Sequence, residues 1–178
     1  ITPDNKAEVK GMSLNKDRNL LAVQLNDQGY FKVAFYNPKT LKENKQPVFP
    51  KKAEQYNLGS TTPDGRYTVV RLETAQEPTL QYVVDWKSGK VQQWAFPSIP
   101  ETTTKDFVGA RLESYPARDG TPIPMFVWKT PACEKKACPV IVDFHGGPEA
   151  QSRPGFRTTL QLYLASGFTY VAPNVRGS

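Results

Sequence analysis

The segment PVIVDFHGGP, from Pro139 to Pro148, decides how the rest of the chain is interpreted. Its first half is a short apolar run, which is typical of a buried strand. The run stops at His145 and two glycines, and glycines lack the Cβ atoms that keep a ligand away from the main chain. Pro148 is expected to stiffen the exit, since its ring fixes the backbone φ angle. The segment therefore predicts a buried strand that ends in a turn whose amide N–H groups can face an incoming oxygen atom.

The first hundred residues contain two similar groups of short strands. Predicted strands lie at Leu20 to Leu25 and Tyr30 to Tyr36, and again at Tyr67 to Leu72 and Leu80 to Trp86. A repeat of this length is typical of β-propeller blades, and the turn Pro63 to Arg66 is similar to a turn found in many blades. The alternative is an antiparallel sandwich with two similar hairpins. Because a ring needs about four to eight blades, we expect the N-terminal part of the propeller to be missing from these residues.

A change of pattern marks the boundary between two predicted domains. The segment Pro97 to Thr104 is polar, rich in proline and without periodicity. We therefore predict C-terminal propeller blades in residues 1–100 and the start of a second domain in residues 105–178.

The second domain is predicted to begin with a hairpin. Its strands are Arg111 to Ala117 and Ile123 to Lys129. Between them, Asp119 and Gly120 are expected to supply the positive φ angles of a tight turn. The pair is therefore antiparallel.

A parallel crossover is predicted after the hairpin. The strand Pro139 to Phe144 precedes a helical pattern of apolar residues from Phe156 to Leu164. Pro154 lies near the start of this helix, and Gly167 lies just past its end, where a left-handed cap is easiest. Phe168 to Pro173 is typical of a further buried strand, so the order of elements predicts a right-handed crossover.

Two cysteines, Cys133 and Cys138, lie in a polar loop between prolines. The chain has one histidine, and it lies elsewhere, so a zinc site in this loop would lack ligands; we expect no metal and no cofactor. We favour a local disulfide, worth about 2 kcal/mol in loop-closure entropy, over two unrelated thiols. A disulfide indicates a periplasmic or secreted protein, with a cytoplasmic location as the alternative.

Charge and hydropathy argue against nucleic acid and membrane partners. The net charge is +6, but the Lys and Arg residues alternate with acidic ones and form no stripe. No run approaches the roughly 18 apolar residues of a membrane span. The start, Ile1 to Asp4, lacks an initiator Met, so the absence of a targeting signal carries no information.

Three motifs in order carry a resemblance to a known family: Leu112 to Pro124, Val142 to Pro148, and Val171 to Ser178. Together they resemble the start of the catalytic domain in the prolyl oligopeptidase family of serine peptidases, which includes acylaminoacyl and dipeptidyl peptidases. Members join a β-propeller to an α/β-hydrolase domain. The resemblance implies that residues 105–178 are the first strands and first helix of that domain. It also implies hydrolysis of peptide bonds in short peptides by a Ser, Asp and His triad.

The triad itself is not expected within this chain. The family carries its nucleophile on a Gly-x-Ser-x-Gly elbow, and no such sequence occurs between Ile1 and Ser178. We expect the chain to end before the elbow, so that alone it hydrolyses nothing. His145 is the only imidazole, but the catalytic histidine of the family follows the nucleophile, and we assign His145 to shaping the turn.

The resemblance implies that His145, Gly146 and Gly147 form half of an oxyanion hole. Relatives with another version of this turn carry a Tyr at the position of His145, and its hydroxyl contributes to the hole. Because this chain has His there, we expect the donor to be a backbone N–H of the glycine pair, first that of Gly147. Arg176 and Asn174 are expected to organise loops, Arg176 through hydrogen bonds to carbonyl groups, with substrate contact as the alternative.

Two other classes of protein stay open. A carboxylesterase or lipase also uses a His-Gly-Gly turn, although such enzymes usually lack a preceding propeller. A non-catalytic binding module would use the propeller to bind a peptide. The expected partners are a short peptide and the remainder of the same catalytic domain and propeller. Because the strand Pro139 to Phe144 should be central in the complete sheet, we expect the isolated chain to be poorly soluble or partly unfolded.

Overall fold

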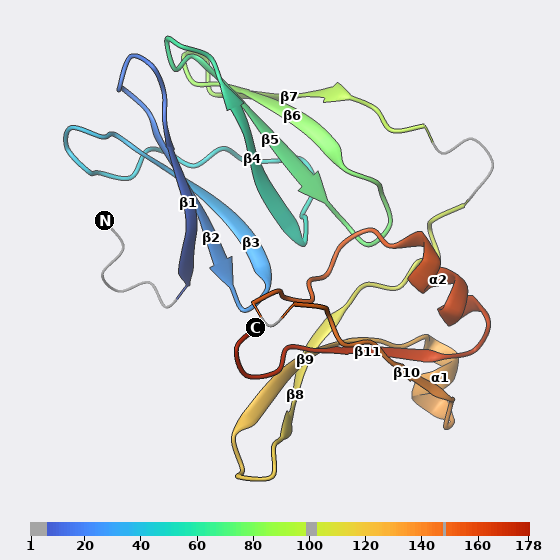
Figure 1. Ribbon diagram of the computed structural model, residues 1–178. Helices are drawn as coiled ribbons and strands as arrows, with labels where there is room; N and C mark the ends of the chain where they lie inside the picture. The colour runs from blue at the N-terminus through green and yellow to red at the C-terminus, as the bar shows by residue number, and fades with distance from the viewer. Residues whose placement is uncertain (1–6, 99–102, 148) are drawn as a thin grey trace.

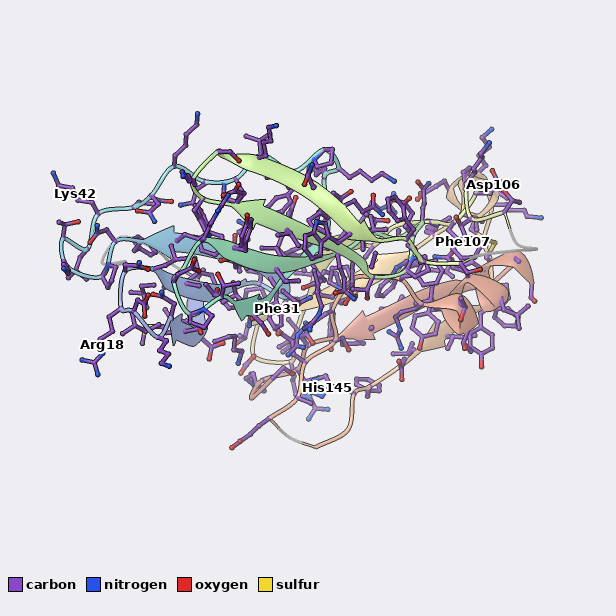
Figure 2. All side chains as sticks on the ribbon, turned by 90° about the horizontal axis from the view of Figure 1, so that it is seen from above. Arg18, Phe31, Lys42, Asp106, Phe107 and His145 are labelled. Atoms are coloured by element: carbon purple, nitrogen blue, oxygen red, sulfur yellow. A yellow bond between two sulfur atoms is a disulfide. The ribbon has the colours of Figure 1, made fainter. Side chains whose placement is uncertain are left out.

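The computed structural model describes residues 7–98, 103–147 and 149–178, and this part of the chain forms eleven strands in three sheets and two short helices (Figure 1). Seen from above, the blue and green strands of the first half lie on the left, and the orange and red elements of the second half lie on the right (Figure 2). Three features considered in the sequence lie outside the described residues: the start of the chain at residues 1–4, residues 99–102 of the boundary segment, and Pro148.

The first sheet is antiparallel and has the order β1-β2-β3. Its strands are β1 (Glu8–Leu14), β2 (Leu21–Asp27) and β3 (Tyr30–Tyr36). The sequence predicted the second and third strands but not the first, because every residue of β1 is exposed and its pattern carries no buried face. The β2–β3 turn is closed by the Asn26 side chain, whose oxygen accepts a bond from the Gly29 N–H at 2.8 Å.

The second sheet is an antiparallel meander of four strands in the order β4-β5-β6-β7. Its strands are β4 (Gln55–Thr61), β5 (Tyr67–Glu73), β6 (Leu80–Asp85) and β7 (Lys90–Ala95). Four antiparallel strands in sequence order are the usual content of one propeller blade. The described residues thus contain a three-stranded and a four-stranded blade-like sheet, and they form no closed ring.

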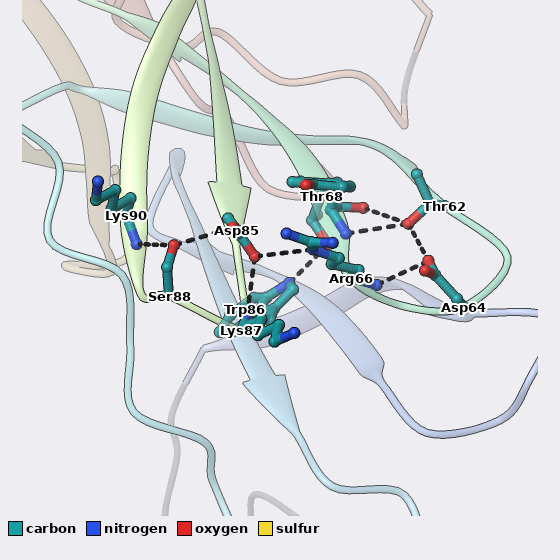
Figure 3. A network of polar contacts seen from close by, with 10 residues as sticks. Thr62, Asp64, Arg66, Thr68, Asp85, Trp86, Lys87, Ser88 and Lys90 are labelled. Carbon is teal, nitrogen blue, oxygen red and sulfur yellow. Dashed lines mark hydrogen bonds and ion pairs between the residues drawn. The ribbon is translucent and has the colours of Figure 1, made fainter.

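The turn before β5 is held by side chains (Figure 3). Asp64 accepts hydrogen bonds from the Thr62 hydroxyl at 2.6 Å and from the Arg66 N–H at 3.0 Å. Beside this turn, the Trp86 indole N–H donates to the Thr68 hydroxyl at 2.9 Å. These bonds explain why an Asp-Gly turn precedes this buried strand.

The first two sheets pack face to face on one apolar cluster. Its buried residues come from both sheets: Leu20, Ala22, Phe35, Val70, Leu72, Leu80, Tyr82 and Val84. The rings of Phe35 and Trp86 meet edge to face with centroids 4.8 Å apart. The apolar residues of the strands predicted in the first hundred residues therefore meet in one core shared by the two sheets.

The third sheet is mixed and has the order β10-β11-β9-β8. Its strands are β8 (Arg111–Pro116), β9 (Pro122–Trp128), β10 (Val140–Val142) and β11 (Thr169–Pro173). β10 and β11 are parallel, and the other pairs are antiparallel. The helix α2 (Thr158–Ala165) connects the parallel strands and packs on one face of the sheet through Leu160 and Leu164.

Three predicted details of this region are wrong. The strand that begins the crossover is shorter than Pro139 to Phe144, because the chain leaves the sheet after Val142. The helix begins at Thr158 rather than near Pro154. In the β8–β9 turn only Gly120 has a positive φ angle, +82°, whereas Asp119 does not, and the Asp119 carboxylate instead accepts the Thr121 N–H at 3.1 Å.

The cysteine loop contains a helix that the sequence did not predict. Helix α1 (Pro131–Lys135) starts at Thr130, whose hydroxyl accepts a bond from the Cys133 N–H at 3.4 Å. Cys133 and Cys138 form the expected disulfide. Pro131 at the first helical position and a threonine before it are common signals for a helix start, but the five residues are too few to show a periodicity.

The two halves of the chain are in direct contact. A Cβ atom built on Gly29 would lie 2.8 Å from the Phe126 ring, so the β2–β3 turn approaches β9 as closely as a glycine allows. The Tyr30 and Phe126 rings meet edge to face with centroids 5.5 Å apart. Asn26 donates a hydrogen bond to the Gln151 side chain at 3.1 Å. The turn of the first sheet therefore fixes the position of the third sheet.

Candidate functional site

The glycine turn lies where the chain leaves β10. The last link to the sheet is the Asp143 N–H, which donates to the Val171 carbonyl at 2.9 Å. Gly147 has a φ angle of +63°, a conformation that favours glycine. A Cβ atom built on Gly146 or Gly147 would meet no described atom within 4 Å. The main chain of the turn is thus open to approach from outside.

His145 connects this turn to the segment after β11. Its Nε2 atom and the Ser178 hydroxyl are hydrogen-bonded at 2.7 Å, and its Nδ1 atom lies 3.3 Å from the Gly146 carbonyl oxygen. The carboxyl ends of neighbouring parallel strands meet at one edge of a sheet, which brings together two motifs 33 residues apart. The imidazole is half-buried and acts here as a bridge between two loops.

Asn174 is a buried side chain that fixes the loop between the turn and α2. Its Oδ1 atom accepts the Ser152 N–H at 2.8 Å, and its Nδ2 group donates to the Ser152 carbonyl at 3.0 Å. The Asn174 N–H donates to the Pro124 carbonyl at 2.8 Å. Both the oxygen and the nitrogen of the amide are therefore bonded to the main chain of one loop residue, and little of the side chain is exposed to a substrate.

Arg176 has a different partner from the one expected. Its Nη1 atom lies 2.6 Å from the Asp119 carboxylate, in the β8–β9 turn, and both side chains are exposed. The Thr121 N–H bond and the Arg176 bond lower the pKa of Asp119 below its ordinary value. Arg176 thus ties the segment after β11 to the hairpin through a carboxylate rather than through carbonyl groups.

The sequence did not predict a polar group that holds the end of β10. The Tyr170 hydroxyl donates to Asp143 Oδ2 at 2.5 Å, and Arg157 Nη2 lies 3.6 Å from the same oxygen. Burial and, after it, the bond to Asp143 raise the pKa of Tyr170 to about 12. The sequence signal that could have indicated this group is the acidic residue Asp143 within an otherwise apolar strand segment. This group anchors the chain immediately before His145.

The described residues offer no site for a metal and no helix for a membrane. They contain no group of three or more His, Cys, Asp or Glu side chains that could hold a metal ion. None of the helices in the described ranges is long and apolar enough to cross a membrane.

Comparisons with known proteins identify the fold. No family model matches the sequence. The chain superposes on a prolyl endopeptidase with a TM-score of 0.82 at 20% identity, over 99% of this chain and 25% of that one. It also superposes on oligopeptidase B from Trypanosoma brucei with covalently bound antipain (TM-score 0.76, 21% identity, 98% and 26% of the two chains). A third match is a puromycin-hydrolyzing peptidase from Mycobacterium tuberculosis (TM-score 0.73, 20% identity, 96% and 28%).

The chain has the fold of a segment of prolyl oligopeptidase-type peptidases. It spans about a quarter of the length of these solved structures. The matched segment includes both blade-like sheets and the third sheet, because almost the whole chain is covered.

Proposed function

We propose that this chain is a segment of a serine peptidase of the prolyl oligopeptidase family that hydrolyses peptide bonds in short peptides. In this proposal, residues 1–100 are C-terminal propeller blades, and residues 105–178 are the first strands and first helix of an α/β-hydrolase domain. The observation that carries the proposal is the open glycine turn at the carboxyl end of β10, joined to the segment after β11 by His145. The shared fold supports it.

The turn supplies half of an oxyanion hole. In acyl transfer from a peptide to a serine, the carbonyl oxygen becomes negatively charged in the tetrahedral intermediate. The Gly147 N–H is the donor to that oxygen, because its residue needs a positive φ angle and has no neighbour that blocks approach. His145 shapes the turn rather than transferring a proton. Its Nε2 atom is already bonded to Ser178.

Asn174 and Arg176 position the surroundings of the turn. Asn174 fixes the loop at Ser152, and Arg176 fixes the segment after β11 on the β8–β9 hairpin. Neither side chain acts on the substrate in this proposal. A preorganised donor is effective only when its loop does not have to reorganise during the reaction.

The nucleophile belongs to a strand that pairs with β10. In the described residues β10 pairs with β11 alone, so its other edge has main-chain groups available for a further strand. Val140, Val142 and Phe144 are 54%, 52% and 61% exposed, and they offer an apolar face to further elements of the same domain. The Ser, Asp and His of the triad come from those elements. The Cys133–Cys138 disulfide supports a periplasmic or secreted location.

A serine-directed fluorophosphonate probe tests the proposal on the full-length protein. We expect one serine to be labelled covalently, and peptide mapping should place it in a Gly-x-Ser-x-Gly sequence on the C-terminal side of Ser178. Hydrolysis of short peptide substrates should stop in proportion to labelling. A protein that is folded but neither labelled nor active on peptides would contradict the proposal and favour a binding module, whereas labelling with activity on esters alone would favour a carboxylesterase.

A further inference from the structure

A pocket lies between the edge of the blades and the segment that leads into the third sheet. Its volume is about 650 Å³, within the range of pockets that bind small ligands. Four aromatic side chains line it: Tyr30, Phe31, Tyr56 and Phe107. None of its lining residues belongs to the glycine turn, and Figure 2 shows His145 well below Phe107 in that view. The pocket is therefore separate from the proposed oxyanion hole.

Glu54 is the one acidic residue among the described residues that line this pocket. Its Oε2 atom is buried and has no hydrogen-bond partner among the described atoms. Its Oε1 atom occupies space left by Gly109, where a Cβ would lie 2.9 Å from it. Burial raises the pKa of Glu54 above its ordinary value. An isolated buried carboxylate is unfavourable, and a structure usually compensates it with a cation or a donor.

The neighbouring lysines do not supply that cation. Lys32 also lines the pocket, but its ammonium group pairs with Asp27. Lys51, next along the chain, pairs with Glu77. Lys52 is exposed at the rim and forms no ion pair with any residue that the structure describes. The Glu54 carboxylate thus borders a pocket without a counterion.

Tyr30 lines the same pocket as Glu54 and adds a second polar group to its wall. Burial and, after it, the charge of Glu54 raise the pKa of the Tyr30 phenol. The ring of Tyr30 packs against Phe126, which fixes its orientation. Because its pKa is raised above the ordinary value, the Tyr30 hydroxyl remains protonated at neutral pH.

We propose that this pocket binds the ammonium or guanidinium group of a peptide, contributed either by its amino terminus or by a Lys or Arg side chain. Aromatic faces attract cations, and organic ammonium ions are commonly bound by several rings around them. A carboxylate at the wall adds a charge-assisted hydrogen bond. The apolar rings accept the stem that carries the cation. The choice of a peptide as the carrier rests on the proposed function, whereas the affinity for the cation does not.

Equilibrium binding to the full-length protein tests this proposal with the active serine blocked by a fluorophosphonate. The probe is protonated phenethylamine, and 2-phenylethanol is its neutral analogue, each titrated by calorimetry. We expect the amine to bind at least tenfold more tightly than the alcohol. Glu54→Gln should weaken amine binding at least tenfold and leave alcohol binding within twofold. Glu43→Gln, which removes an equal charge from an exposed residue outside the pocket, should change neither value.

Two peptides distinguish the sources of the cation. One is trialanine amide with a free amino terminus, and the other is N-acetyl-Ala-Arg-Ala amide. Tighter binding of the first assigns the pocket to the amino terminus, and tighter binding of the second assigns it to a basic side chain, provided that Glu54→Gln abolishes the preference. Amine affinity that is unchanged in Glu54→Gln, or absent in the parent protein, would overturn the proposal. These results are independent of fluorophosphonate labelling, whose failure would instead contradict the peptidase function.

Discussion

The Gly147→Val substitution gives the sharpest test of the glycine turn. Gly147 has a φ angle of +63°, where a side chain costs roughly 1–2 kcal/mol and a β-branched one is a rare outlier. A Cβ at this position meets no described atom, so the strain and not a clash decides the effect. Relief of the strain rotates the peptide and turns the N–H away from the substrate oxygen. Loss of a preorganised donor costs about 3 kcal/mol in the transition state, which corresponds to roughly a 100-fold fall in kcat.

The measurement is steady-state hydrolysis of a short chromogenic peptide by the full-length protein. We expect kcat to fall about 100-fold while KM changes less than threefold, since the interaction exists only in the transition state. Gly89→Val is the matched control, because Gly89 has a φ angle of +71° in an exposed β6–β7 turn and a Cβ there also meets no atom within 4 Å. It should lose similar stability and no activity. A Gly147→Val protein with unchanged kcat would refute the oxyanion assignment.

Three further predictions concern residues away from the turn. Asn174→Ala should lower the free energy of unfolding by about 2 kcal/mol and speed hydrogen exchange at the Ser152 amide, because two main-chain groups lose their partner; unchanged exchange would contradict this. Replacing Cys133 and Cys138 together by serine should cost about 2 kcal/mol in a urea titration, and equal midpoints would show that the bridge constrains nothing. Burial raises the pKa of Glu54, so the unfolded state ionises first and stability falls as the pH rises from the unfolded pKa to above the folded one. Glu54→Gln should not show this fall. In urea titrations at several pH values, the free energy of unfolding of the variant minus that of the parent protein should therefore increase with pH between the unfolded-state and the folded-state pKa of Glu54. A difference that does not change with pH would refute the argument.

In the two blade-like sheets, the sequence predicted the strands whose apolar residues are most deeply buried. β2, β3, β5 and β6 carry apolar residues that enter the shared core, and their patterns were visible. β1, β4 and β7 were missed because they lie at the edges of their sheets and are polar or exposed. Pairing with a neighbour, rather than burial, makes them strands, and a single sequence does not show pairing.

The candidate site was predictable in part. The parallel crossover was predicted, and in the structure it brings the glycine turn and the segment after β11 to one edge of the sheet. The hydrogen-bond partners of His145, Asn174 and Arg176 could not be predicted, because each bond joins groups that are many residues apart in the sequence. Asp143 was predicted to lie within the strand Pro139 to Phe144, and its bond to Tyr170 depends on the register of β10 against β11.

The contact between the β2–β3 turn and the third sheet bears on how the chain folds. Asn26 and Gln151 are 125 residues apart in sequence, so their bond joins parts of the chain that only the tertiary fold brings together. Closing a loop of this length costs on the order of 4 kcal/mol in chain entropy, which a few polar bonds alone do not repay early in folding. We therefore expect docking of the two halves to be a late kinetic step, so that substitutions at Gly29 change the unfolding rate more than the folding rate.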